Sequence, residues 1–366
     1  MPLYMDFHKF PGITIEDAKK AHAADEEIQK KYGVKYLQFW VNEGGGSIFC
    51  LVEGPDKLTC ETVHQMSHGH VACAMVEVDP RYYALVMGEN SRIDQGLVHH
   101  ENGSIDLGYR SVLVVSLRGK ASAADSTNYD YLKVPHKARE VVLGEISKFN
   151  GRVLKLTGDD SLVSVFDSAT QATSCAKEIQ EGLLLQRKNT GGKEDTVSFT
   201  IGLSAGQPVT ENNEFIEETI RLAKRLGHIA GEDRILASSM IHELCEEDPA
   251  MKSLSASEEA FITNLFGIIE AQLSDENFNI EGLGREVGIS RPQLYRKILS
   301  LTGKAPNDLI RDFRMDKAWS LLRRKSGNIS EIAFDVGFSN PSYFAKCFAR
   351  KFGCPPSKFT AIASTS

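Results

Sequence analysis

Two histidines four residues apart are spaced so that both could bind one metal ion. His64 and His68 lie within residues 55–68, whose pattern predicts a helix, so both side chains would project from the same helix face. Neutral imidazoles at that spacing can hold a borderline divalent metal such as Ni²⁺ or Zn²⁺. The competing interpretation is that they are ordinary surface or hydrogen-bonded histidines.

A usable metal site needs at least a third ligand from elsewhere in the chain. His8 is the first choice, because it ends a strand with a polar Tyr4-Asp6-His8 face and could reach a dimer interface on an open sheet. His70, just past the helix end, is the second choice, and His22 is a further candidate.

A second chemically capable set occurs in two copies near the C-terminus. Residues 287–297 read VGISRPQLYRK and residues 336–346 read VGFSNPSYFAK, an offset of 49 that becomes 50 at the closing Gly303 and Gly353. Each copy has a glycine that ends one helix, then Ser290 or Ser339 as the expected N-cap of the next, and then proline. This is the pattern of a helix-turn-helix, and the residues expected to contact base edges or phosphates are Arg291, Gln293, Arg296, Lys297, Asn340, Ser342, Lys346 and Arg350.

The duplicated stretch resembles the AraC/XylS family of transcription regulators over about residues 260–360, most closely in IAFDVGFSNPSYFAKCFARKFGCPPSKF. The resemblance implies seven helices, two of which enter successive major-groove segments on one face of double-stranded DNA. The chain carries a formal charge of −7, but residues 285–358 hold 15 Lys and Arg against 6 Asp and Glu. The basic footprint is therefore local, as attraction to phosphates requires.

A third set lies in the middle of the chain, around the turn Gly158-Asp159-Asp160. Residues 110–245 alternate strand and helix patterns, and the pieces FNGRVLKLTGDDSLVSVF and FTIGLSAG resemble class III adenylate/guanylate cyclases. The resemblance places a metal carboxylate at Asp159, a base-reading lysine at Lys155 and a transition-state arginine at Arg225. The other metal carboxylate falls on Ser116, which cannot replace a charge. We therefore expect an inactive cyclase-like domain kept for dimerisation or nucleotide sensing, with an active cyclase as the alternative.

Helices and strands of the N-terminal region must position the histidine pair. The pattern of residues 1–80 predicts the order strand, helix, strand, strand, helix, strand. That order is typical of a ferredoxin-like sandwich whose sheet leaves one face open. The pieces MPLYMDFHKFPG, AHAADEEIQKKYGVKYLQFWV and VHQMSHGH resemble a family of small bacterial nickel-responsive proteins. The resemblance implies a bound Ni²⁺ or a related transition metal.

Length and composition fit several domains in one chain. With 366 residues we expect a multidomain α+β protein, in which two ferredoxin-like α/β sandwiches (1–92 and 108–248) precede an all-α twin helix-turn-helix domain (258–360). Residues 81–107 are expected to be an irregular connector. Seven cysteines without a CxxC pair favour reduced thiols in the cytoplasm, and no segment reads as a leader or a membrane span.

These patterns together predict a cytoplasmic, homodimeric transcription regulator that binds DNA and senses a metal or a nucleotide. It is not expected to be an enzyme. A metal store with an attached DNA anchor is a weaker third possibility, because nothing resembles a multi-site metal store.

Overall fold

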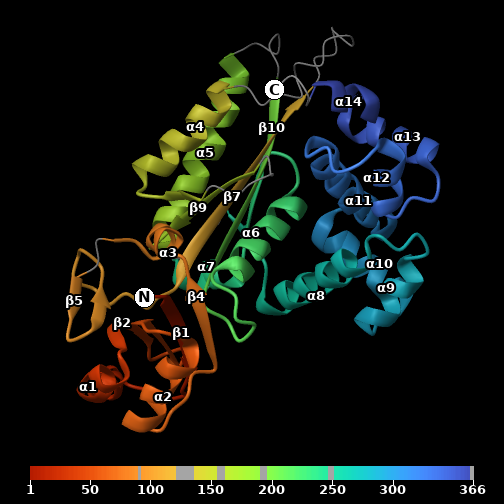
Figure 1. Ribbon diagram of the computed structural model, residues 1–366. Coiled ribbons are helices and arrows are strands. Elements are labelled where there is room, and N and C mark those ends of the chain that lie inside the picture. The colour runs from red at the N-terminus through yellow and green to blue at the C-terminus, as the bar shows by residue number, and fades with distance from the viewer. Residues whose placement is uncertain (90–91, 121–135, 155–160, 190–195, 246–250, 363–366) are drawn as a thin grey trace.

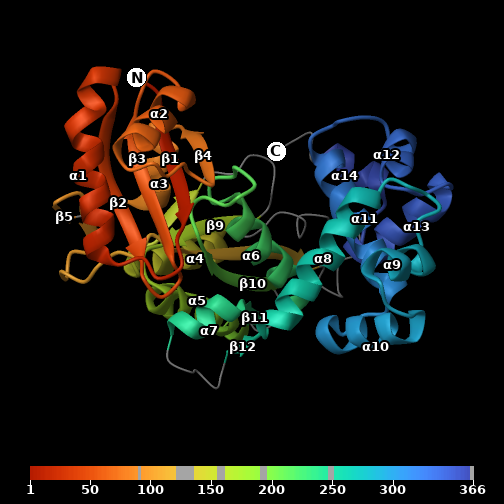
Figure 2. The same cartoon turned by 90° about the horizontal axis from the view of Figure 1, so that it is seen from below.

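The computed structural model describes residues 1–89, 92–120, 136–154, 161–189, 196–245 and 251–362. Within these residues the chain forms two six-stranded mixed sheets followed by a group of helices. Figures 1 and 2 show the second sheet in the middle, with the first sheet on one side and the C-terminal helices on the other.

The first sheet has the strand order β4-β1-β3-β2-β6-β5. Its first four strands and two helices follow the predicted order along the chain: β1 (Leu3–Lys9), α1 (Ile15–Tyr32), β2 (Lys35–Asn42), β3 (Ser47–Glu53), α2 (Lys57–Ser67) and β4 (Ala74–Val78). β1 pairs antiparallel with both β3 and β4 and therefore lies inside the sheet. The predicted strand and helix order of residues 1–80 is confirmed.

Residues 81–107 are not an irregular connector, contrary to the sequence interpretation. They contain most of helix α3 (Pro80–Met87) and the hairpin β5 (Arg92–Asp94) and β6 (Leu97–His99), which extends the first sheet through β2. Asp79 caps α3 by accepting from the backbone N–H groups of Arg81 and Tyr82, with proline following the cap. The cap residue and the proline after it are helix-start signals that the sequence itself contains. The first sheet also extends beyond residue 92, where the first domain was expected to end.

The second sheet has the strand order β12-β11-β10-β7-β9-β8. Its elements are β7 (Arg110–Lys120), α4 (His136–Lys148), β8 (Arg152–Leu154), β9 (Ser161–Phe166), α5 (Ala169–Asn189), β10 (Thr196–Gly206), α6 (Glu217–Ala230), β11 (Arg234–Ala237), α7 (Ser239–Leu244) and β12 (Lys252–Ser253). α4 and α5 cover the face that carries Leu113 and Val115, and α6 lies on the opposite face. Gly202 permits this approach, because a Cβ there would lie 1.9 Å from the carbonyl oxygen of Ala223.

The two sheets share one hydrophobic core. α1 and α2 cover the face of the first sheet that carries Tyr4, whereas Met5 and Phe7 on the other face pack in one cluster with Val112 and Val114 of β7. The face expected to stay open for a dimer partner is therefore covered within the chain. The Tyr4-Asp6-His8 face is also not exposed, because these residues lie beneath the helices and are 0–6% exposed.

The C-terminal region is all helical and comprises α8 (Ala256–Gln272), α9 (Ile280–Val287), α10 (Arg291–Thr302), α11 (Pro306–Arg323), α12 (Ile329–Asp335), α13 (Pro341–Phe352) and α14 (Pro356–Ile362). These are the seven helices expected. Both helix pairs turn at a glycine with positive φ, Gly288 and Gly337. A Cβ on Gly337 would meet the carbonyl oxygen of Leu273 at 2.5 Å, so glycine is required there.

The C-terminal helices pack directly on the second sheet's domain. Leu226 and Ile229 of α6 belong to one cluster with Leu265 and Phe266 of α8, and Arg118 at the end of β7 donates to Asp316 of α11 at 2.7 Å. None of the helices in the described ranges combines the length and the apolarity needed to cross a membrane.

Candidate metal centre and nucleic-acid interface

Three elements of the first domain bring histidines and carboxylates together beneath its helices. β1 contributes Asp6 and His8, α1 contributes Asp25, and α2 contributes His64 and His68. All but His68 are buried, and His68 is partly buried. The two α2 histidines share one helix face, as their spacing predicts.

His64 lies between two buried carboxylates. Its Nε2 donates to Asp6 Oδ2 at 2.9 Å, and its Nδ1 lies 3.1 Å from Asp25 Oδ2. Burial by itself would lower the pKa of His64, but the hydrogen bonds and charges of Asp25 and Asp6 outweigh burial and raise this pKa to about 10. Burial acts to raise the pKa of Asp25, yet its contacts with His64 and His68 lower it to about 2.

Three ligand atoms at this centre are arranged as around a single ion. His64 Nδ1, His68 Nε2 and Asp25 Oδ2 are separated by 3.1, 3.1 and 3.5 Å. Ligand atoms about 2.1 Å from one divalent transition metal lie about 3 Å from each other, so two imidazoles and one carboxylate fit such an ion. A protonated Nδ1 has no lone pair, so the ion must displace that proton of His64.

A metal bound at Nδ1 of His64 would leave the Nε2–H hydrogen bond to Asp6 intact. A carboxylate on the far nitrogen of a ligating histidine fixes its ring and raises its basicity. The Asp6 carboxylate is held in turn by the backbone N–H of Cys50, which donates to it at 2.8 Å. Asp6 is thus better placed to orient the His64 ring than to bind the ion directly.

The predicted third ligands lie next to this triad rather than in it. The His8 ring centroid is 4.8 Å from that of His64, but its Nε2 lies on the Asp6 side, 3.4 Å from that carboxylate. His70 is exposed, and its backbone N–H donates to His68 Nδ1 at 3.3 Å. The sequence interpretation missed Asp25, although Ala18, His22 and Asp25 follow the i, i+4, i+7 spacing of a buried helix face.

A cavity of about 310 Å³ opens beside the triad. Its wall includes Asp25, His64 and His68, together with the side chains of α1 that face the sheet. His22 also lines it, and burial lowers the pKa of His22. The candidate metal centre is therefore at the edge of a space large enough for more than an ion.

The second candidate site is the surface of α10 and α13, which begin 50 residues apart. All eight residues predicted to contact DNA are exposed. Leu294 and Phe344 are the first buried residues of these helices, so Arg296 and Lys346, each two positions later, occupy equivalent places. In Figures 1 and 2 both helices lie on the side of the molecule away from the first sheet.

The second copy of the motif has one extra residue, which lies in the turn between its two helices. The N-cap predicted for α13 is therefore wrong by one residue. Asn340, not Ser339, is the N-cap of α13 and accepts from the backbone N–H of Tyr343 at 3.0 Å. In the first copy, Ser290 caps α10 as predicted, within a capping box completed by Gln293. The side-chain oxygens of Asn340 and Gln293 are therefore already hydrogen-bonded to the helix ends.

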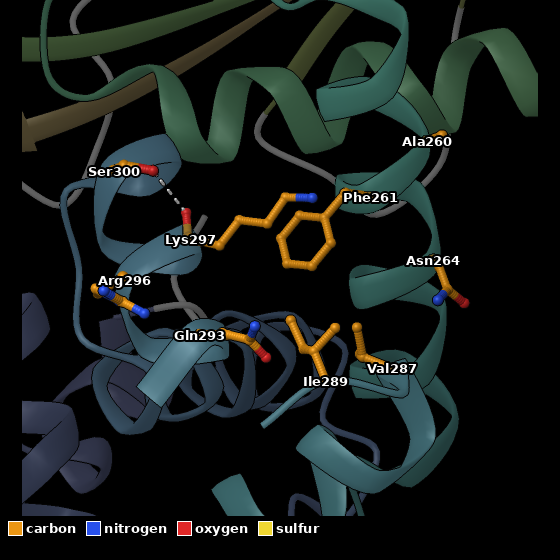
Figure 3. Close-up of a pocket in the computed structure, with 9 residues that line it drawn as sticks. All are labelled: Ala260, Phe261, Asn264, Val287, Ile289, Gln293, Arg296, Lys297 and Ser300. Atoms are coloured by element: carbon orange, nitrogen blue, oxygen red, sulfur yellow. Dashed lines mark hydrogen bonds between the residues drawn. The ribbon is translucent and has the colours of Figure 1, made fainter. Parts of the chain in front are cut away.

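Two of the predicted cations on α10 contact neighbouring helices. Arg291 pairs with Glu281 of α9 at 2.8 Å, both side chains being exposed. The Lys297 ammonium lies over the ring of Phe261 on α8, 4.1 Å from its centroid, in an open groove (Figure 3). Figure 3 also shows Arg296 farther from Phe261 than Lys297 is. Arg296 nevertheless lines the same groove.

Of the three residues predicted to bind a nucleotide, the structure describes only Arg225. Lys155 and Asp159 lie outside the described residues. Ser116 is hydrogen-bonded to Ser161 through their hydroxyl oxygens, 2.8 Å apart. The guanidinium of Arg225 pairs with Glu270 of α8 at 2.7 Å and donates to the carbonyl oxygen of Thr263. Arg225 thus joins α6 to the C-terminal helices.

Comparison with known families matches the two ends of the chain. Residues 283–361 match a helix-turn-helix domain, and residues 4–78 match the nickel-responsive protein SCO4226-like family. The solved structure of SCO4226 from Streptomyces coelicolor A3(2) is 36% identical and covers 21% of this chain and 94% of that chain, with a TM-score of 0.20.

Two curated relatives each match less than half of this chain. An uncharacterized HTH-type transcriptional regulator in the cgkA 5′ region of Pseudoalteromonas carrageenovora is 32% identical over 128 residues, 34% of this chain and 75% of that protein. Histidine kinase P4 of Formosa agariphila is 32% identical over 158 residues, but the chain spans only 11% of its length. The chain thus belongs to the AraC-type helix-turn-helix family of DNA-binding transcription regulators and carries an N-terminal domain of the SCO4226-like nickel-responsive family.

Proposed function

We propose that this regulator binds double-stranded DNA with α10 and α13 and that its first domain senses a divalent transition metal, with Ni²⁺ the leading candidate. The observation that carries the sensing role is the triad of Asp25, His64 and His68, whose ligand atoms are 3.1–3.5 Å apart. The name of the matched N-terminal family supports nickel among the metals that such ligands accept.

The contact between β1 and the second sheet supports coupling of the metal centre to DNA binding. Asp6 faces the centre, while Met5 and Phe7 on the same strand pack against the core shared with Val112 and Val114. The side chains of a packed core adopt a few distinct arrangements rather than a continuous range. A shift of β1 can therefore favour one arrangement of the neighbouring domain over another. The second domain in turn contacts the C-terminal helices through Arg225 and Arg118.

On α10 and α13 we propose Arg296, Lys346, Ser342 and Arg350 as the groups that reach bases or phosphates. All four are exposed. Arg291, Gln293, Lys297 and Asn340, which already contact neighbouring groups, would exchange partners on binding. We also propose that the protein acts as a homodimer, which sedimentation at micromolar concentration will test.

The experiment measures DNA affinity with and without metal. Duplexes selected by the protein from random sequence are titrated by fluorescence anisotropy at fixed salt, with and without Ni²⁺. We expect Ni²⁺ to change the dissociation constant at least about fivefold, the lower end of ordinary allosteric coupling. The double variant His64→Ala/His68→Ala should bind DNA but show no response to the metal.

His136→Ala is the matched control, because that histidine is highly exposed on α4 and distant in sequence from the triad. It should keep the full metal response. An unchanged DNA affinity on adding Ni²⁺, Zn²⁺ or Co²⁺ to the wild type would refute metal sensing but not DNA binding.

The alternative function, a nucleotide cyclase joined to a DNA-binding domain, is not favoured by Ser116 or by the position of Arg225. The matching HTH-type transcriptional regulators also favour a protein that is not an enzyme, whereas histidine kinase P4 is matched over only 11% of its length. Cyclic nucleotide formed from ATP or GTP with Mg²⁺ or Mn²⁺, and lost in Asp159→Ala, would support the alternative.

A further inference from the structure

The cavity beside the metal triad is larger and more apolar than a metal ion requires. Its volume of about 310 Å³ is that of a small ligand site, whereas one water molecule takes up about 30 Å³. Apolar side chains make up much of its wall, among them Phe10, Ile13, Ala21, Phe39 and Ile48. Water around a hydrated ion would find no hydrogen-bond partner on these side chains.

The triad supplies only part of a coordination shell. Two imidazoles and one carboxylate leave positions free on a five- or six-coordinate ion. All three ligand residues line the cavity, which gives a further ligand access to the ion from this side. The ion can therefore be completed by a molecule in the cavity rather than by the protein.

Two further histidines belong to the same wall. His8 and His22 line the cavity and are 3% and 6% exposed. Within the described residues, Nδ1 of each ring has no hydrogen-bond partner. Buried polar atoms are rarely left unsatisfied, so a ligand in the cavity that reached these rings would gain hydrogen bonds from them.

We propose that this cavity binds a small organic molecule with an apolar body and a metal-coordinating nitrogen or carboxylate head, so that the sensor recognises a metal complex rather than a free ion. The proposal rests on the proposed metal-sensing function. The head completes the coordination of the ion held by Asp25, His64 and His68. The body packs against the apolar wall, and His8 and His22 hydrogen-bond to the ligand's polar atoms.

Calorimetry of the full chain with two probes tests this inference. Imidazole and 4-phenylimidazole offer the same coordinating nitrogen, but only the second carries an apolar body. Titrated into Ni²⁺-loaded protein, 4-phenylimidazole should bind at least about tenfold more tightly, because burying a phenyl group removes apolar surface from water. Equal affinity for the two probes overturns the proposal.

Filling the cavity should remove this preference. Ala21→Phe places a ring on the cavity wall, while Ala23→Phe, on the exposed side of α1, is the matched control. Ala21→Phe should keep Ni²⁺ and imidazole binding but lose most of the advantage of 4-phenylimidazole. Ala24→Leu, also on the wall, serves if Ala21→Phe does not fold. An advantage kept in a folded cavity variant also overturns the proposal.

The direct Ni²⁺ titration separates this inference from the proposed function. Zn²⁺ and Co²⁺ are titrated in the same way. If none of the three metals binds, metal sensing fails, and 4-phenylimidazole is then titrated into the metal-free protein. If 4-phenylimidazole binds the metal-free protein and Ala21→Phe abolishes that binding, the cavity is a site for an organic ligand alone. That result overturns the proposal that its ligand is a metal complex. No binding of either probe under both conditions overturns the cavity as a ligand site.

Discussion

At the scale of single residues, side chains of the same type differ in pKa and in contacts because their surroundings differ. His64 is buried between Asp6 and Asp25, which raises its pKa to about 10, whereas burial lowers the pKa of His228 to about 4. Arg296 and Arg225 are both arginines on helices. One is exposed on α10, and the other is 9% exposed and paired with Glu270. The environment therefore decides which of these groups can meet a ligand.

The first prediction concerns Arg296 on the first recognition helix. Arg296→Ala should weaken binding to the selected duplex by about 1–3 kcal/mol and relax specificity at one base position, because a base-reading arginine is lost. Lys346→Ala, at the equivalent place on α13, should weaken binding too. Fluorescence anisotropy across single-base variants of the duplex measures both effects.

Arg139→Ala is the control, because Arg139 is exposed on α4 of the second domain. It removes the same charge outside the C-terminal helices and should leave affinity nearly unchanged. If Arg296→Ala bound all duplexes as wild type does, the assignment of α10 as a base reader would be wrong.

At the scale of elements, β1 and β7 connect the first two domains. Each has one face in its own domain's core and another in the core shared by both sheets. Arg110, at the start of β7, is fully buried there and donates to Asp106 at 2.8 and 3.0 Å and to the carbonyl oxygen of Met87. Trp40 of β2 also donates to Asp106. This ion pair fixes the junction of the two sheets.

The second prediction concerns this buried pair. Arg110→Met should lower the free energy of unfolding by about 3–5 kcal/mol, because Asp106 would remain buried without its cation. Urea unfolding followed by circular dichroism measures the loss. The double variant Arg110→Met/Asp106→Leu should recover much of it. A loss below about 1 kcal/mol in the single variant would show that Asp106 escapes to solvent.

At the scale of the whole molecule, the C-terminal helices are held against the second domain by a charged cluster. Asp316 of α11 lies 2.7 Å from Arg118, 3.3 Å from His228 and 3.0 Å from Lys351 of α13. The His228 ring packs edge-on against Phe266 and next to Phe313. Helix α13 is thus linked through Asp316 to the second domain, which in turn contacts the first.

The third prediction is a pH dependence of this junction. Burial lowers the pKa of His228 to about 4, although Asp316 acts to raise it, so the ring is neutral in the folded protein at pH 7. The unfolded chain takes up the proton near pH 6.5, so the folded state loses stability as pH falls from about 6.5 toward 4. The contribution of His228 between pH 7 and pH 5 should be roughly 1–2 kcal/mol.

His228→Phe keeps the ring and removes the titration. Its unfolding free energy, measured by urea denaturation at several pH values, should fall less steeply than that of the wild type between pH 7 and pH 5. Parallel curves for the two proteins would mean that His228 does not control the acid sensitivity.

The sequence by itself determined the features that short-range signals encode. The glycine turns, the cap at Ser290 and the apolar spacing of the last helices act within a few residues, so the twin helix-turn-helix could be predicted from one chain. The same holds for the strand and helix order of residues 1–80. One short-range signal was misread, because the extra residue of the second copy moves the cap of α13 from Ser339 to Asn340.

Only the tertiary structure decided what distant segments do to each other. Asp25 became the third member of the triad because α1 and α2 pack side by side, a contact that their separate patterns do not contain. The face of the first sheet expected to be open is covered by the second domain, and Arg225 pairs with Glu270, 45 residues away. Local patterns state which face of an element is apolar, but which partner buries that face depends on the packing of the whole chain.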